Sequence, residues 1–230
     1  MKKIVLTLLV LLSSLVASDM PPHKPHMTFK MYQSVPINKA TLLQHGKEKM
    51  FCPVCGMNLP MWYKTNHSAT HNHHTSQYCS LHCLTEDLKT KKLNNLQVVD
   101  ISSLKFINVS KAFYVVGSKK KGTMTMVSKY AFAHKKDAQT FMNKFGGKIM
   151  SFTEALKVSE KDFAKETKII HKKQAMMAKK GKMMYTKMCQ QTEQRFHSVA
   201  KAKAYLLDSK ICGNIRGKKL HMIGMYLSGK

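Results

Sequence analysis

The stretch FCPVCGMNLPMWYKTNHSATHNHHTSQYCSLHC, residues 51–83, holds four of the chain's six cysteines and five of its twelve histidines. Cys52 and Cys55 form one close pair, and Cys79 and Cys83 form a second pair after 23 intervening residues. Two close thiol pairs separated by a longer loop are typical of a tetrahedral metal site. Thiolates bind zinc or Cu(I), because both ions are soft or borderline.

Three interpretations of these cysteines remain open at this level: two disulfides, a zinc site, or a site for Cu(I) or thiol redox chemistry. Among the histidines, His82 is the strongest candidate ligand, because it lies between Cys79 and Cys83. Met57 and Met61 flank the first pair, where a methionine more often packs in the core. The other histidines of the stretch are His67, His71, His73 and His74.

The first 18 residues predict a secretory signal peptide. A short basic start at Met1-Lys2-Lys3 precedes an apolar run over residues 4–16, followed by small residues. The run is too short to span a bilayer comfortably, so an uncleaved anchor is the weaker interpretation. Cleavage near residue 18 would give a periplasmic protein whose residues 19–45, rich in proline, form an exposed leader. A short helical turn is expected at residues 41–44.

The chain is strongly basic, with a formal net charge of +27, or +25 without residues 1–18. Export argues against a nucleic-acid partner. The charge would then favour an acidic partner or an anionic membrane surface, although a solvated lysine-rich surface is the simpler interpretation. The chain contains eighteen methionines and a single tryptophan. Methionine sulfur is a soft ligand, so this composition favours Cu(I) or zinc over magnesium or calcium.

The pattern from residue 84 to residue 158 predicts a mixture of strands and helices. A helix is expected over 84–93 and another over 135–145, where Gly146-Gly147 ends it. Strands are expected over 97–101, 106–116, 124–133 and 148–152.

Residues 159–230 predict a helical appendage. A helix capped by Thr153 should run to about Lys180 and break at Gly181, with further helices over 196–207 and 218–227. The default role of the methionines over 176–189 is core packing, and the alternative is a second, weak Cu(I) site. Cys189 and Cys212 are expected to form a disulfide. The appendage faintly resembles a cytochrome c frame, but no Cys-x-x-Cys-His motif is present to attach haem.

An ordered series of motifs over about residues 46–158 resembles the NosL family, accessory proteins of nitrous oxide reductase. The series consists of Cys55-Gly56-Met57, Trp62-Tyr63-Lys64, Tyr78-Cys79, AFYVVGS at 112–118, GTMTM at 122–126, Asp137-Ala138-x2-Phe141, Gly146-Gly147 and Ser151-Phe152. The Cys-Gly-Met motif alone is weak, whereas the ordered series is fairly specific.

The resemblance implies an α+β fold made of two ββα units. It also implies a periplasmic Cu(I)-binding protein, not an enzyme, that delivers copper to nitrous oxide reductase or another periplasmic copper protein during denitrification. Family members use a Met-x-His pair as copper ligands, and the matching positions here are Met124 and Met126. If both lie on one strand, their thioethers point to one face and can share one ion.

The chain departs from the family pattern, because many members carry an N-terminal lipid-anchoring cysteine that is missing here. That cysteine can also supply a copper ligand in those members, so the third ligand is open here. Cys52, Cys55 or the segment from Cys79 to Cys83, which includes His82, could replace it, and Met57 is a further candidate metal ligand. The leading hypothesis is a metallochaperone that works by ligand exchange. The alternatives are a structural zinc- or disulfide-stabilised interaction domain and, ranked lowest, a thiol oxidoreductase using Cys52 and Cys55.

Overall fold

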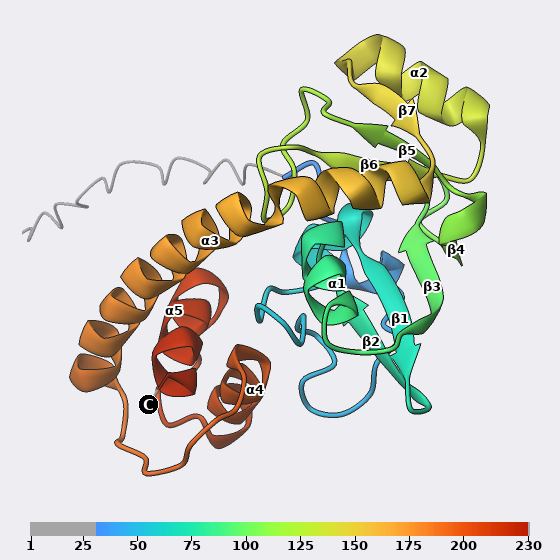
Figure 1. Cartoon of the computed structure of the whole chain (residues 1–230). Helices are drawn as coiled ribbons and strands as arrows, with labels where there is room; N and C mark the ends of the chain where they lie inside the picture. The colour runs from blue at the N-terminus through green and yellow to red at the C-terminus, as the bar shows by residue number, and fades with distance from the viewer. Residues whose placement is uncertain (1–30, 230) are drawn as a thin grey trace, which may run out of the picture. The chain divides into compact units, whose positions relative to one another are not determined.

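Two small antiparallel sheets, one of four strands and one of three, organise the computed structural model, which describes residues 31–229 (Figure 1). The expected signal peptide and residues 19–30 of the expected leader lie outside the described residues. In each sheet the first strand of a hairpin is central. It pairs with the second strand of the hairpin on one side and, on the other, with a strand that follows a helix.

The first unit contains β1 (His67–His71), β2 (His74–Tyr78), α1 (Leu81–Leu88), β3 (Asn94–Val99) and β4 (Phe106–Asn108), in the sheet order β2-β1-β3-β4. Asn72 and His73 make a two-residue turn in which both φ angles are positive, at 46° and 64°. This turn twists in the sense that a tight hairpin requires. The helix expected over 84–93 corresponds to α1, which begins at Leu81 and ends at Leu88, earlier than the sequence pattern indicated.

The second unit contains β5 (Phe113–Val116), β6 (Lys129–Phe132), α2 (Lys135–Phe145) and β7 (Lys148–Met150), in the order β6-β5-β7. The bounds of α2 agree with the prediction, and Gly146 ends it with a φ of 72°. The α+β class and the two ββα units are confirmed. Each unit gains one further strand beside its central one.

The expected strand over 124–133 is only partly correct, because β6 begins at Lys129. Residues 117–128 form a loop between β5 and β6, and Met124 has a φ of 68°, outside the strand region. The loop is held at its base by Gly117 N–H, which donates to the Ser128 carbonyl at 2.9 Å. The prediction that Met124 and Met126 share one face of a strand is therefore wrong.

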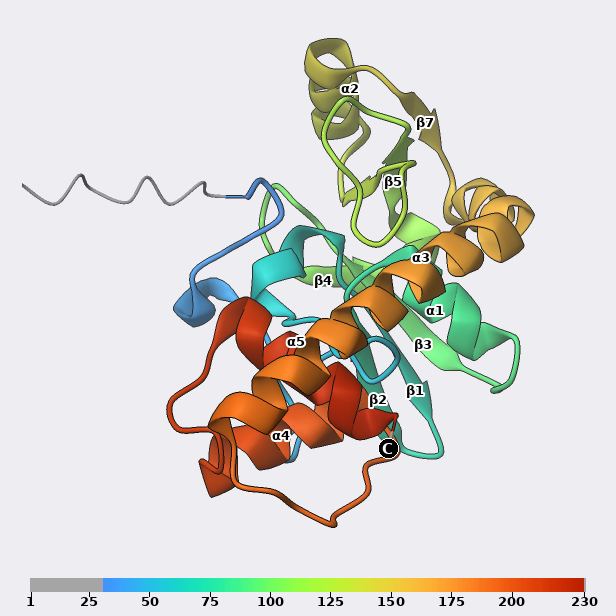
Figure 2. The same ribbon diagram turned by 90° about the vertical axis from the view of Figure 1, so that its left-hand side faces the viewer.

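The helix α3 (Phe152–Met188) is the longest element, and it crosses from the second unit to the C-terminal helices (Figure 2). Ser151, not Thr153, caps it, in a reciprocal capping box with Glu154. Gly181 does not break the helix. A side chain there would overlap the Met222 carbonyl oxygen, so the glycine allows a close helix crossing.

Two further helices follow, α4 (Val199–Ser209) and α5 (Gly217–Ser228); α5 packs against α3, and α4 packs against α5. The predicted disulfide between Cys189 and Cys212 is confirmed, and it ties the end of α3 to the turn before α5. Their shared core holds Tyr185, Leu206 and Ile223, together with Phe51 from the first unit. The expected boundary between residues 158 and 159 falls inside α3, without a break in the helix.

The described part of the leader is less exposed than predicted. Gln33 and Gln44 are buried, and Leu42 packs against the core of the first unit. The Gln33 side-chain amide donates to the Lys121 carbonyl at 2.6 Å, which ties the leader to the 117–128 loop. The expected helical turn at 41–44 is absent, and a short 3₁₀ turn occurs earlier, at Ile37–Lys39.

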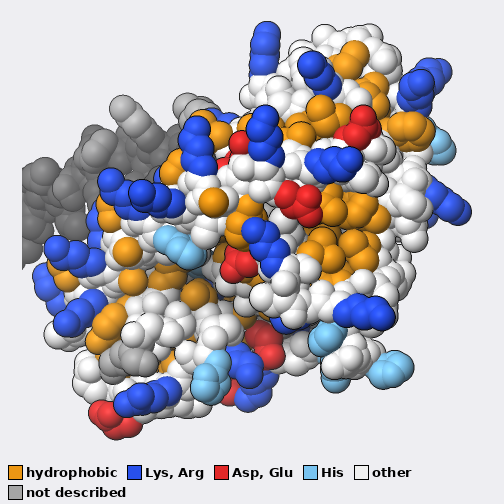
Figure 3. All heavy atoms as spheres, viewed as in Figure 1, with side chains coloured by type: hydrophobic (Ala, Val, Ile, Leu, Met, Phe, Trp, Pro, Cys, Tyr) orange, Lys and Arg blue, Asp and Glu red, His pale blue; other side chains and the backbone are white. Residues whose placement is uncertain are grey.

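Lysine and arginine side chains are spread along α3 and over much of the face in Figure 3, with few acidic ones among them. Among residues 31–229, no helix combines the length and apolar character needed to cross a bilayer.

Candidate metal centre

The first cysteine pair lies on a tight turn. Cys52 N–H donates to the Met57 carbonyl, and Gly56 N–H donates to the Cys52 carbonyl, both at 2.8 Å. Gly56 has a φ of 71°, and a side chain there would overlap Val199 of α4. Glycine is required twice, for the backbone conformation and for the close approach of α4. The turn therefore points two thiols inward without a helix, which argues against a thioredoxin-type redox motif.

The second pair lies where β2 ends and α1 begins. Ser80 is the N-cap of α1, and its hydroxyl accepts from the Cys83 backbone N–H at 3.4 Å. Cys83 thus lies in the first turn of α1, where the cap fixes its backbone. The Thr65 hydroxyl donates to the Cys79 carbonyl at 2.8 Å and fixes the backbone between strand and helix.

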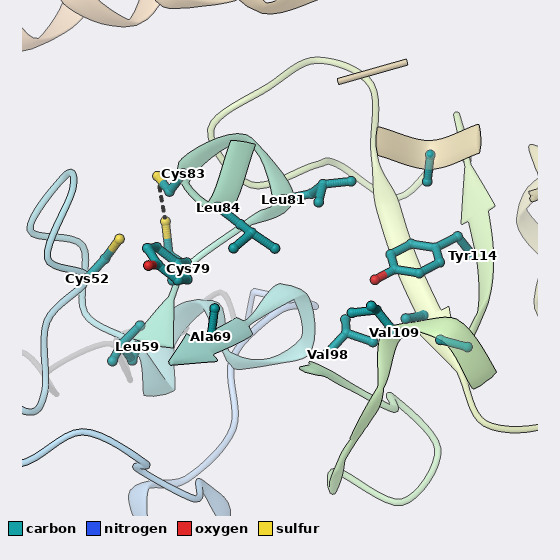
Figure 4. Packing of buried hydrophobic residues seen from close by; sticks show 14 of the residues in the cluster. Cys52, Leu59, Ala69, Cys79, Leu81, Cys83, Leu84, Val98, Val109 and Tyr114 are labelled. Carbon is teal, nitrogen blue, oxygen red and sulfur yellow. Dashed lines mark hydrogen bonds between the residues drawn. The ribbon is translucent and has the colours of Figure 1, made fainter. Parts of the chain in front are cut away.

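The four thiols converge, and their sulfur atoms all lie within 4.8 Å of one another. The Cys55 and Cys79 sulfurs are 3.4 Å apart, and the Cys79 and Cys83 sulfurs are 3.7 Å apart. In Figure 4 the side chains of Cys52, Cys79 and Cys83 point toward a shared space above the β-sheet core. A tetrahedron with metal–sulfur bonds of 2.3 Å has edges of about 3.8 Å, so the arrangement fits one metal ion.

All four cysteines are free thiols, and each has at most 2% of its surface exposed. We call these four residues the thiol cluster. The disulfide alternative for Cys52, Cys55, Cys79 and Cys83 is therefore not what the structure contains, although the thiols are close enough for oxidation.

The thiol cluster distributes its charge unevenly. Burial acts to raise the pKa of Cys52, but hydrogen bonds from Cys55, Cys79 and Cys83 outweigh it and hold that pKa well below its usual value. The pKa of Cys79 is raised by burial and by its hydrogen bonds to Cys52 and Cys55. The pKa of Cys83 is raised chiefly by its hydrogen bonds to the same thiols. The cluster therefore favours the thiolate form of Cys52 over those of Cys79 and Cys83, and a bound cation would favour ionisation of all of them.

A buried cation from the C-terminal helices lies beside this charge. Lys203 of α4 donates to the Gly56 carbonyl at 2.7 Å, and its ammonium lies 3.8 Å from the centre of the Phe51 ring. Burial lowers the pKa of Lys203 to about 8, while the charges of Cys55 and Cys52 act to raise it. Lys203 therefore compensates thiolate charge from outside the predicted metal domain.

His82 lies apart from the thiol cluster, although it was the strongest histidine candidate. Its ring stacks on Phe163 of α3 with centroids 4.8 Å apart, and its Nδ1 lies 3.7 Å from a carboxylate oxygen of Glu166. In the first turn of α1, the side chain of residue 82 points to a different side from that of residue 83. His82 is close to Cys79 and Cys83 in the sequence, but its side chain does not join the thiol cluster in the structure.

The predicted methionines divide into two groups. Met57 and Met124 line a cavity of about 210 Å³ that Cys55 also lines, whereas Met126 is 84% exposed. The Thr123 hydroxyl lies 2.7 Å from that of Thr65, and this contact fixes the loop just before Met124. The structure therefore brings Met124 and Met57 to the thiol cluster but leaves Met126 in solvent.

Sequence reasoning singles out Met177, within the group 176–189, but misses the other donors on the far wall of this cavity. Met177 of α3 and His221 and Met225 of α5 complete a lining that we call the soft-donor cavity, together with Cys55, Met57 and Met124. Burial and the charge of Lys203 lower the pKa of His221 to about 4, and the Gly56 backbone offsets this only in part. The i, i+4 spacing of His221 and Met225 was the available signal, but nothing in the sequence indicated which surface the two residues face.

The sequence profile of the NosL family matches residues 44–158, half of the 230-residue chain. The chain belongs to the NosL family. The matched NosL segment contains both ββα units and all four residues of the thiol cluster, and it ends in the second turn of α3. The predicted resemblance over residues 46–158 is thereby confirmed, while α4, α5 and most of α3 lie beyond the match.

Among solved structures, the chain is similar to the crystal structure of the copper chaperone NosL from Shewanella denitrificans. The identity is 26%, and the similarity covers 52% of this chain and 96% of that one, with a TM-score of 0.40. No curated protein sequence matches the chain.

Proposed function

We propose that the chain is an exported Cu(I)-binding accessory protein that holds copper at the thiol cluster and passes it to a partner by ligand exchange. The observation that carries this proposal is the convergence of four thiols within 4.8 Å in a NosL-family segment. Thiolate sulfur is the ligand that Cu(I) prefers. Nitrous oxide reductase, or another periplasmic copper protein, is the acceptor we propose.

Export is supported by the two kinds of cysteine in one chain. The Cys189–Cys212 disulfide indicates an oxidising compartment such as the periplasm. In that compartment, sulfurs 3.4 Å apart would be prone to oxidation, and a bound metal ion would protect them. A signal peptide over residues 1–18 and an exposed leader remain part of the proposal. So does the division into a metal domain over 46–158 and an appendage over 159–230, with the two joined by α3.

Copper is the cargo, and the chain's residues determine how it leaves. Cys55 faces the soft-donor cavity, so an incoming thiolate or imidazole can reach the ion there while the Cys55–copper bond breaks. Copper stays in the +1 state, and no electron is transferred. Lys203 lies beside Cys55 and stabilises the thiolate that the exchange frees. We propose no catalytic step.

The depth of the thiol cluster favours a second candidate, a structural zinc site in an interaction domain. Closed, four-coordinate cysteine sites typically hold zinc for stability, and these thiols are buried. The two candidates differ in the fold of the metal-free chain, because a structural zinc domain unfolds without its ion.

Anaerobic titration of the purified chain with Cu(I), against a competing chelator and with zinc present, tests the proposal. We expect tight Cu(I) binding that survives zinc, and a loss of about a thousandfold in affinity in Cys52→Ser/Cys55→Ser, roughly 4 kcal/mol. Met124→Ala should weaken binding or speed release, while Met126→Ala should not. Zinc retained in preference to Cu(I), or unfolding of the metal-free chain, would support the structural candidate instead.

A further inference from the structure

The soft-donor cavity contains more ligand atoms than the thiol cluster requires. One wall belongs to the NosL segment and carries Cys55, Met57 and Met124. The opposite wall belongs to α3 and α5, and it carries Met177, His221 and Met225. Four methionines and one histidine thus line a space of about 210 Å³ that Cys55 of the cluster also lines.

Helical spacing explains why the opposite wall is continuous. The α3 residues that line the cavity are Ile170, Lys173, Gln174 and Met177, at positions i, i+3, i+4 and i+7 of one helix face. His221 and Met225 are one turn apart on α5. Gly181 permits the close crossing that brings these two helices together. The cavity is therefore built by the packing of regular elements and not by a loose loop.

The polar atoms of His221 are poorly satisfied by the protein. Both of its ring nitrogens are buried without a partner in hydrogen-bonding geometry, although the Gly56 backbone is near enough to act on its pKa. Buried polar groups are normally satisfied, so a histidine in this state is available to a ligand. A soft metal ion in the cavity would supply the missing bond.

We propose that Met177, His221 and Met225 form a second Cu(I) site, which receives the ion from Cys55 on its way out of the thiol cluster. The proposal rests on the proposed function, because copper must first bind to the thiols. In the transfer, bonds from Cu(I) to the thioethers and the imidazole form while the bond to the Cys55 sulfur breaks. All new ligands are neutral, so the ion can bind without proton release.

This site differs from the second site that the sequence suggested among residues 176–189. Met176, Met183 and Met188 are exposed, at 53%, 54% and 43%, and Cys189 is in the disulfide. Met184 packs with the C-terminal core. Of that group only Met177 reaches the cavity, and its co-ligands come from α5.

The test compares Cu(I) stoichiometry and release in two variants of matched chemistry. Met177→Leu/Met225→Leu/His221→Leu removes the site with side chains that still pack. Met176→Leu/Met183→Leu changes two exposed methionines of α3 and serves as the control. Under anaerobic titration the wild type should bind a second Cu(I) equivalent more weakly than the first. The triple variant should lose that equivalent and release the first to a chelator about tenfold more slowly.

X-ray absorption at the copper edge adds a readout that altered packing would not change. A nitrogen contribution should accompany the second equivalent and disappear in His221→Leu alone. The inference would be overturned if the triple variant still bound the second equivalent, kept the nitrogen contribution and released copper at the wild-type rate. In that case the first equivalent would still bind to the cysteines. Failure of the proposed function is a different result, because then neither equivalent would depend on the thiol cluster.

Discussion

The NosL segment and the C-terminal helices use cysteine in opposite ways. The segment gathers four free thiols from a turn and a helix start, and no bond joins them. Beside the C-terminal helices, Cys189 and Cys212 form a disulfide. The first arrangement leaves the thiols free to bind a metal ion, whereas the second joins the end of α3 to the turn before α5. The comparison teaches that one chain can keep four thiols reduced in one region while it uses a disulfide to fix the neighbouring region.

The two regions meet at the thiol cluster itself. Val199 of α4 lies against Gly56, Lys203 binds the Gly56 carbonyl, and α5 closes the cavity beside Cys55. The C-terminal helices are therefore part of the environment of the metal centre and not a separate attachment. Variants that affect one region and spare the other can break or sharpen this comparison.

The largest effect is expected from the thiol cluster. Cys79→Ser/Cys83→Ser should weaken Cu(I) binding about a thousandfold, roughly 4 kcal/mol, because two thiolate ligands are lost. Cys189→Ala/Cys212→Ala should change Cu(I) affinity by less than about threefold. Chelator competition measures both. Equal losses in the two variants would contradict the division of roles between the cysteines.

The disulfide variant should show its effect in stability instead. Removing a link that closes 23 residues should lower the free energy of unfolding by about 3 kcal/mol. Urea unfolding measures the total, and hydrogen exchange should locate the loss in α4 and α5. Loss of amide protection mainly in the two sheets would contradict the view that the disulfide stabilises the C-terminal helices.

The helix crossing gives the next effect. Gly181→Ala should destabilise the chain by about 2 to 3 kcal/mol, because the methyl group would overlap the Met222 carbonyl oxygen. Gly229→Ala is the matched control, since its added methyl group would have its nearest neighbours at 3.8 Å. Thermal unfolding compares the two. A Gly181→Ala protein as stable as the control would show that α3 and α5 do not need this close approach.

Acid should destabilise the NosL segment through His67. Burial lowers the pKa of His67 to about 4, against about 6.5 in the unfolded chain, although a hydrogen bond to the Thr65 carbonyl opposes the shift. The unfolded chain therefore binds more protons between these values, so stability falls as the pH drops through this window. The contribution of His67 should be about 2 kcal/mol between pH 8 and pH 5.

His67→Gln supplies the control for this pH dependence. The amide can replace the contacts that His67 makes with the Thr65 carbonyl and the Tyr114 hydroxyl, each at 3.1 Å. Urea unfolding at several pH values should show a shallower acid slope in the variant. An unchanged slope would show that His67 is not the group that takes up the proton.

The smallest predicted effect concerns the charge that links the regions. Lys203→Met should weaken Cu(I) binding about tenfold, because a buried cation beside Cys55 and Cys52 is lost. Lys201→Met, on an exposed position of the same helix, should leave binding unchanged. The pH at which copper is half released should rise in the Lys203 variant alone. The same shift in both variants would show that the effect comes from the net charge of the chain and not from the position of Lys203.

The sequence predicted local features well and contacts between distant segments poorly. The bounds of α2 followed from a clear apolar face and two terminal glycines, and the cysteine spacing predicted the thiol cluster. The hairpin turn at Asn72-His73 was missed because it lacks glycine. Gly181 was interpreted as a helix break, since local propensity does not reveal that α5 crosses at that point.

The candidate site shows the same limit. The alternation of Met124 and Met126 suggested a strand, but the contacts that hold the 117–128 loop come from Gln33 and Thr65, far away in sequence. His82 was predicted as a ligand because it lies between Cys79 and Cys83 in the sequence, but α1 directs its side chain toward Glu166. The positions of His221 and Lys203 near the thiol cluster result from the packing of α4 and α5, which cannot be predicted from the sequence around either residue.

X-ray absorption at the copper edge of the chain loaded with one Cu(I) equivalent tests the central claim most directly. The account predicts a shell of sulfur ligands that is lost or replaced in Cys79→Ser/Cys83→Ser and retained in Cys189→Ala/Cys212→Ala. A shell made of nitrogen and oxygen alone, or a sulfur shell that both variants leave unchanged, would contradict the assignment of the thiol cluster as the copper site.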